Sequence, residues 1–296
     1  MDKNEEPSSV KASIKYIKWQ ELYEKEKPFQ IFIDIRKDAV DQRYHNLVFE
    51  NKQETFFNIR GREQEFRLDD HGFAYHHHHF NFDDYEDRVS VESSYLPQVE
   101  SFIRNEVEEV DKVFFFDWRL RHSGSYPKGT EIDLNDPTDW LLPSIHAHID
   151  QAPGAVLNRT LLQLPDEAEF LLRGRVRVIT VWKPLRNPVE DWPLAVCDGS
   201  NVEYSDMVET DHVRRLYTGA NMNVMHRAKY RWHYLHKQSE SEVLLLKQFD
   251  SASNVKARFS PHVSFEHPNV PTGAPRRESI EVRALVFTYA HPNGSS

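Results

Sequence analysis

A histidine and an aspartate stand two positions apart near the middle of the chain, in the segment Ser144-Ile145-His146-Ala147-His148-Ile149-Asp150-Gln151. In a β-strand, or in the turn that leaves it, residues i and i+2 project to the same side. The imidazole of His148 and the carboxylate of Asp150 can therefore bind one metal ion together. The other interpretation is a histidine at a strand end that hydrogen-bonds a nearby carboxylate, because short H-x-D pairs arise often by chance in a chain with 16 histidines.

The C-terminal part of the chain supplies two further motifs. His262 opens the apolar segment Pro261-His262-Val263-Ser264-Phe265, and an Arg277-x-Ser279 pair begins the next predicted strand. Two histidines and one carboxylate on one face of an iron ion leave positions open for a cosubstrate and O2, as in non-haem Fe(II) sites. A guanidinium and a hydroxyl on one side of a strand suit a carboxylate such as the distal one of 2-oxoglutarate. The order H-x-D, His, R-x-S therefore favours an iron site with an adjoining carboxylate clamp.

At this point the chain resembles the Fe(II)/2-oxoglutarate-dependent oxygenase superfamily. More specifically, it is similar to a mostly fungal natural-product group that includes gibberellin desaturase-like enzymes and proteins annotated after the cephamycin 7α-methoxylation component. The similar segments cover most of residues 70 to 290 and are Phe115–Arg121, His146–Gln151, Ile179–Leu185, Pro193–Asp198, Leu246–Ser251 and Arg277–Arg283. The sequence departs from the expected pattern at Trp118, where a His is expected, and at Thr180, where an Asn is expected. These departures concern substrate preference and leave the metal ligands unchanged.

The resemblance implies a double-stranded β-helix, the jelly-roll of the cupins, with N-terminal helices against one sheet. It implies Fe(II), 2-oxoglutarate and O2 as cofactor and cosubstrates, and oxidation of a small secondary metabolite with release of succinate and CO2. The outcome would be hydroxylation, desaturation or a related C–H oxidation. Two alternatives stay open, namely a non-catalytic accessory jelly-roll protein of a biosynthetic pathway and an iron oxygenase that does not use 2-oxoglutarate.

Other residues compete for these roles. His212, His226, His233 and His236 lie in the long insert between His148 and His262, but no Arg-x-Ser pair follows any of them at a comparable distance. Arg283 shares a strand face with Arg277 and is the second candidate for the clamp. His146 shares the face of His148 and is expected to orient the site instead of binding the metal. Lys247 is expected either to touch a bound molecule or to lie at a solvated strand edge.

Two polar groups have less specific interpretations. The run His76-His77-His78-His79 places alternate imidazoles on opposite faces of an extended segment, so we interpret it as a surface strand and not as a metal tract. Asp117, Arg119 and Arg121 alternate with apolar residues and either face a cavity or form a surface ion pair.

Composition limits the choice of partners and compartment. The 296 residues contain 37 Lys and Arg against 47 Asp and Glu, a net charge of −10, with no basic block. This argues against nucleic acid or an anionic membrane as a partner, whereas the small-molecule substrate is what the resemblance implies; the oligomeric state is not predicted. Apolar runs are too short to span a bilayer, and the single Cys197 excludes an internal disulfide and a cysteine-based metal site. We expect a cytoplasmic protein.

The pattern of apolar residues predicts mainly β-structure. We expect residues 1–12 to be disordered and residues 13–296 to form a single oxygenase domain with its jelly-roll core at about residues 110–290. Helices are predicted at Trp19–Lys27, Leu96–Val107 and Asp166–Arg173, and a hairpin at Thr55–Ile59 and Glu65–Leu68. The remaining strands are predicted at Gln30–Ile35, Lys112–Leu120, Val176–Trp182, Glu242–Phe249, His262–Phe265 and Ser279–Tyr289.

Overall fold

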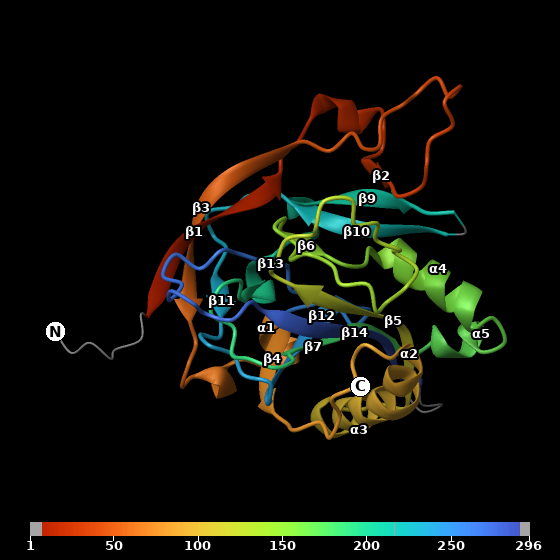
Figure 1. The fold of residues 1–296 in the computed structure, drawn as a ribbon. Coiled ribbons are helices and arrows are strands. Elements are labelled where there is room, and N and C mark those ends of the chain that lie inside the picture. Colours follow the sequence, from red (N-terminus) through yellow and green to blue (C-terminus); the bar gives the residue numbers. More distant parts are fainter. Residues whose placement is uncertain (1–7, 216, 291–296) are drawn as a thin grey trace.

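Two β-sheets make up most of the computed structural model, which describes residues 8–215 and 217–290 (Figure 1). The larger sheet has nine strands in the order β1 (Ser9–Ile17), β3 (Phe49–Asn58), β11 (Trp232–Tyr234), β8 (Leu194–Cys197), β13 (His262–Ser264), β6 (His148–Ile149), β10 (Thr218–Val224), β9 (Met207–Val213) and β2 (Phe29–Ile31). The smaller has five, in the order β4 (Phe73–His77), β12 (Glu242–Asp250), β7 (Arg175–Pro184), β14 (Glu278–Thr288) and β5 (Lys112–His122). Strands far apart in sequence are neighbours in both sheets, as the predicted jelly-roll requires.

The helices cover the smaller sheet and one end of the fold. α3 (Leu96–Glu106) begins with Pro97 in its first turn and buries Val99, Phe102 and Ile103, which lie on one helical face. These side chains pack on the outer face of the five-stranded sheet, and Figure 1 shows α3 on the side of that sheet away from β9 and β10. α4 (Pro153–Gln163) and α5 (Ala168–Leu171) lie at one end, while α1 (Leu68–His71) and α2 (Arg88–Ser90) are single turns.

Inward-facing side chains of both sheets fill the space between them, and they alternate along each strand with side chains that face the other way. Trp182, Leu244 and Leu246 of the smaller sheet pack against Leu194 and Val196 of β8. Neighbouring residues on the same strands face the opposite way, because successive side chains of a strand alternate. This alternation also turns His262 and Ser264 inward and leaves Val263 in the core on the other face of β13.

Five of the six strands predicted outside the hairpin are confirmed with boundaries within two residues, whereas the strand predicted at Gln30–Ile35 is shorter and forms β2. The predicted helix at Leu96–Val107 is confirmed, whereas those at Trp19–Lys27 and Asp166–Arg173 shrink to a 3-10 turn at Glu21–Glu24 and to α5. The predicted hairpin at Thr55–Leu68 is wrong, because β3 pairs with β1 and β11 and the following segment forms a 3-10 turn and α1.

The prediction of disorder over residues 1–12 is wrong for residues 9–12, which begin β1; residues 1–7 lie outside the described residues. Val10 and Ala12 are buried and alternate with exposed or half-buried neighbours, so the strand is held by its apolar face. The division into a single domain over residues 13–296 stays a prediction.

Candidate metal centre

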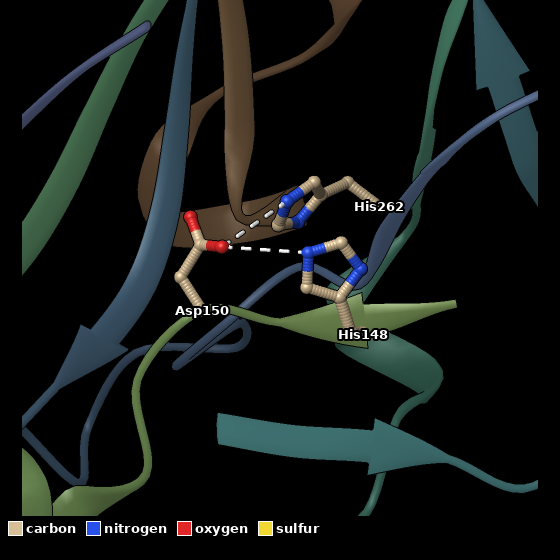
Figure 2. Close-up of side chains that lie close together, drawn as sticks. All are labelled: His148, Asp150 and His262. Atoms are coloured by element: carbon tan, nitrogen blue, oxygen red, sulfur yellow. Dashed lines mark ion pairs between the residues drawn. The ribbon is translucent and has the colours of Figure 1, made fainter. Parts of the chain in front are cut away.

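His148, Asp150 and His262 meet at the inner face of the nine-stranded sheet (Figure 2). β13 pairs with β6 so that His262 lies directly opposite His148, and the centroids of the two imidazole rings are 4.3 Å apart. Asp150 follows β6 and faces the same side as His148, because Ile149 between them points into the core on the other face. One potential ligand atom from each of the three residues lies within 4.8 Å of the other two. Strand pairing thus joins the two sequence motifs into one site.

The Asp150 carboxylate is held by contacts on both of its sides. Oδ1 lies 3.4 Å from Nε2 of His148 and 3.9 Å from Nε2 of His262. Oδ2 accepts a hydrogen bond from Nε of Arg283 at 2.8 Å, and the backbone N–H of Asp150 donates to Oε1 of Gln248 at 2.9 Å. One carboxylate oxygen is therefore fixed by the protein while the other faces the two histidines.

The protonation states match those of metal ligands. Burial lowers the pKa of His262 to about 3, so its imidazole is neutral at physiological pH. Burial alone would raise the pKa of Asp150, but the positive charge of Arg283 outweighs it and holds this pKa well below the usual range. Nδ1 of His148 lies 2.7 Å from the carbonyl oxygen of His146, to which it donates when neutral, and this leaves Nε2 as the free ligand atom. Neutral imidazoles and an ionised carboxylate are the forms that bind a metal ion.

Arg277, the predicted clamp residue, lines a small pocket next to the three residues. The pocket is narrow, with a volume of about 10 Å³, and is also lined by His148, His262 and Trp182. The Arg277 side chain is 1% exposed, and its Nη1 donates to the carbonyl oxygen of Trp192 and to Oγ of Ser264, both at 2.8 Å. Its Nε and Nη2 have no hydrogen-bond partner among the described residues, and neither does Oγ of the buried Ser279.

Buried donors without partners are rare in folded proteins, because desolvation without a compensating hydrogen bond is costly. The free donors of Arg277 therefore fit an anionic group that binds in this pocket. Burial also lowers the pKa of Arg277 to about 10, so the guanidinium is still charged at physiological pH. The residues present fit the carboxylate of a bound oxo acid next to a metal ion.

Arg283 differs from Arg277 because each of its three nitrogens already has a carboxylate partner. Its three nitrogens contact three carboxylates, with Nε 2.8 Å from Asp150, Nη1 2.7 Å from Asp117 and Nη2 2.6 Å from Glu281. Arg283 therefore holds the metal-site carboxylate in place and is not available to a second anion.

The rival residues lie elsewhere or play other parts. Among the described residues, only His148, Asp150 and His262 form a group with metal-ligand spacing. His146 packs on Phe49 at 4.2 Å between ring centroids and lines the larger cavity described below. His76 contacts Glu106, and the buried Lys247 pairs with Asp69 and Asp250, so neither reaches the site.

Two polar side chains near the site were not predicted from the sequence. Gln248 accepts from the Asp150 backbone and donates through Nε2 to Oγ1 of Thr180 at 3.1 Å. Thr180, one of the two departures from the family pattern, therefore supports the aspartate through Gln248. Trp118, the other departure, packs in the core beneath α3 and does not line either pocket at the site.

A larger cavity of about 670 Å³ opens on the other side of His148 and Asp150. Aromatic and aliphatic side chains form part of its wall, among them Phe32, Phe49 and Phe116. Its volume is in the range of small-molecule sites. No helix in the described part of the chain has the length and apolar character needed to cross a bilayer.

The fold is a jelly-roll, and two histidines and one carboxylate meet on its inner face. This combination is typical of mononuclear metal proteins with a cupin-like fold. A family model described as "Oxidoreductase/YMDC permease-like domain" matches residues 14–287, and the chain belongs to this family. Within the Fe(II)/2-oxoglutarate-dependent oxygenase superfamily it belongs to the fungal natural-product group, as the relatives below show.

The chain is 32% identical to the Fe(II)/2-oxoglutarate-dependent dioxygenase nvfI of Aspergillus novofumigatus, over 78% of this chain and 82% of that protein. It is 32% identical to the hydroxylase/desaturase CTB9 of Cercospora beticola, over 81% of this chain and 77% of the relative. A 41% identical match to aspirochlorine biosynthesis protein N of Aspergillus oryzae covers 46% of this chain and 58% of that protein. The solved structure of the iron and alpha-ketoglutarate-dependent endoperoxidase NvfI superposes with a TM-score of 0.81 at 26% identity, over 96% of this chain and 99% of that one.

Proposed function

We propose that this chain is an Fe(II)- and 2-oxoglutarate-dependent oxygenase in which His148, Asp150 and His262 hold the iron. Arg277, with Ser279 beside it on β14, binds the distal carboxylate of 2-oxoglutarate. The observation that carries the proposal is the pair of buried, unpartnered nitrogens of Arg277 in a pocket that His148 and His262 also line. The relatives that are named for Fe(II) and 2-oxoglutarate support the same cofactors.

Bound iron and 2-oxoglutarate supply the oxidising chemistry, in which O2 is consumed, 2-oxoglutarate becomes succinate and CO2, and a C–H bond of the substrate is oxidised. The residues of this chain position the reactants and exclude water. Arg283 and Gln248 orient Asp150, and the carbonyl of His146 fixes the tautomer of His148. Trp182 and Leu194 close the cosubstrate pocket with apolar surface.

The substrate is a small secondary metabolite that binds in the larger cavity, next to His148 and Asp150. Relatives named hydroxylase/desaturase and endoperoxidase support oxidation of a natural product, with hydroxylation or desaturation as the outcome. We also propose a cytoplasmic location, which the single, buried and unpaired Cys197 supports.

Anaerobic titration tests the proposal. Protein loaded with Fe(II) is titrated with 2-oxoglutarate, and the visible charge-transfer band of the chelated oxo acid is recorded. The band should appear in the wild type and require a much higher 2-oxoglutarate concentration in Arg277→Ala. A wild-type protein that binds iron but shows no band would favour an oxygenase without 2-oxoglutarate, and a protein that binds no iron would favour an accessory jelly-roll protein.

A further inference from the structure

The larger cavity is strongly basic although the protein as a whole is acidic. Five of the described side chains that line it are arginines, whereas only two are carboxylates, on a chain whose net charge is −10. The arginines are Arg119, Arg121, Arg159, Arg214 and Arg283, and the carboxylates are Asp117 and Asp150. The excess of positive charge is thus local to the proposed substrate site.

Three of these arginines are neutralised within the protein. Arg283 contacts three carboxylates, Arg119 contacts Asp117 at 3.2 Å, and Arg121 contacts Glu281 at 2.9 Å. Their charges are therefore used to hold the wall of the cavity and the metal-site aspartate.

Arg159 of α4 and Arg214, which follows β9, have no carboxylate partner among the described residues. Arg159 makes one long hydrogen bond, from Nη1 to Oε1 of Gln163 at 3.5 Å, and its buried Nε has no partner. Arg214 donates only to the carbonyl oxygen of Leu134, also at 3.5 Å. Both guanidinium groups are thus left with most of their donors free at the cavity wall.

Aromatic rings hold the two guanidinium groups where carboxylates would otherwise do so. The guanidinium carbon of Arg159 lies 4.2 Å from the ring centroid of Phe116 and 5.0 Å from that of Tyr217, and that of Arg214 lies 5.3 Å from the centroid of Phe32. A guanidinium that contacts a ring through its face keeps its in-plane N–H groups available for an oxyanion. Burial lowers the pKa of Arg214, and the positive charges of Arg119, Arg283 and Arg159 lower it further.

We infer that Arg159 and Arg214 bind the carboxylate of an acidic substrate whose apolar body lies against the phenylalanines of the cavity. This inference rests on the proposed function and specifies its substrate class as an organic acid. An anion between the two groups would relieve the repulsion among the arginines and satisfy their free donors. Because Arg277 lines the adjoining pocket, whereas Arg159 and Arg214 line only the larger cavity, the substrate carboxylate and 2-oxoglutarate bind at different positions.

Binding of two matched fluorescent probes to the metal-free, full-length protein tests the inference. Pyrenebutyrate carries a carboxylate, and pyrenebutanol has the same ring and chain but no charge. We expect the wild type to bind pyrenebutyrate at least tenfold more tightly, because each charge-assisted hydrogen bond contributes about a factor of ten or more. Arg159→Gln and Arg214→Gln should each remove most of this preference and leave the pyrenebutanol affinity unchanged.

Controls separate the possible causes of a loss of binding. Arg173→Gln removes an exposed arginine beside α5 and should leave both affinities unchanged. Arg159→Lys should restore part of the preference if it is the charge that counts, and thermal unfolding identifies any variant that fails to fold. Equal affinities of the wild type for the two probes, glutamine variants with the wild-type preference, or displacement of pyrenebutyrate by excess 2-oxoglutarate would each overturn the inference. None of these outcomes depends on the 2-oxoglutarate titration of iron-loaded protein, so the inference and the proposed function fail separately.

Discussion

Arg283 and Asp150 form a buried ion pair that fixes one oxygen of the carboxylate and leaves the other to the histidines. Nε of Arg283 donates to Oδ2 at 2.8 Å, while Oδ1 faces Nε2 of both His148 and His262. The same guanidinium contacts Asp117 on β5 and Glu281 on β14. The orientation of the proposed metal ligand is therefore set by two strands of the opposite sheet, β5 and β14, and not by β6 alone.

Replacement of Arg283 should disturb both stability and metal affinity. Arg283→Met leaves three buried or half-buried carboxylates with fewer partners, and breaking a buried pair in this way costs about 3–5 kcal/mol of unfolding free energy. Urea unfolding measures this loss, and the absorption of bound Co(II) reports the accompanying decrease in metal affinity. As a matched control, Arg186→Met removes a half-exposed arginine that pairs with Glu278 and Glu86, and should cost less than about 1 kcal/mol. Similar losses in the two variants would contradict this role of Arg283.

Alanine variants of the three proposed ligands should lose metal without loss of fold. His148→Ala, Asp150→Ala and His262→Ala each remove one donor, so Fe(II) bound per protein, measured anaerobically after gel filtration, should fall to a small fraction. Asp150→Ala is expected to keep the most, because chloride or water can fill the vacated position. His226→Ala is the control, since this histidine contacts Glu54 and Tyr16 away from the site. Full iron binding by His262→Ala would show that His262 is not a ligand.

The candidate site was predictable to the extent that its chemistry is local. The i, i+2 spacing of His148 and Asp150 and the order of the following motifs were enough to propose the ligands, which β6–β13 pairing then brings together. The Arg-x-Ser spacing favours Arg277 over Arg283 for the clamp, but the sequence could not show that carboxylates outside β14 already contact Arg283 and leave donors of Arg277 free.

The errors in the fold also arise from non-local pairing. β3 pairs antiparallel with β1 and parallel with the distant β11. Local turn residues carry no information on these pairings, so the sequence could not indicate them in place of the expected hairpin. The missed start of β1 is different. The alternation of Val10, Ala12, Ile14 and Tyr16 was a strand signal within a polar segment, and burial of these residues confirms it.

A histidine outside the site should make stability depend on pH. Burial lowers the pKa of His233 from 6.5 to about 4, and its ring lies among Phe66, Phe73 and Phe57. Above pH 6.5 the imidazole is neutral in both states, whereas between pH 6.5 and 4 the unfolded chain binds the proton more readily, so acid favours unfolding. This histidine can lower the unfolding free energy by at most about 3 kcal/mol by pH 4. In urea unfolding, the His233→Phe variant should therefore lose less unfolding free energy than the wild type over that pH range. Parallel curves of unfolding free energy against pH for the two proteins would contradict the shifted pKa.

The clamp predicts a selective loss of cosubstrate affinity. Arg277→Ala removes charge-assisted hydrogen bonds to the distal carboxylate of 2-oxoglutarate, each of which contributes about 1.5–3 kcal/mol, so the apparent 2-oxoglutarate requirement should rise at least tenfold. Fe(II) affinity without cosubstrate should change little, because Arg277 contacts Trp192 and Ser264 and not the ligand residues. Arg277→Lys should recover only part of the loss, since one ammonium cannot make a two-pronged contact. Ser279→Ala should have a smaller effect in the same direction.

Succinate release against 2-oxoglutarate concentration measures each change, with Arg173→Ala as the control for loss of an exposed arginine. An unchanged 2-oxoglutarate requirement in Arg277→Ala would leave the free donors of this buried guanidinium without a ligand and the clamp assignment without support.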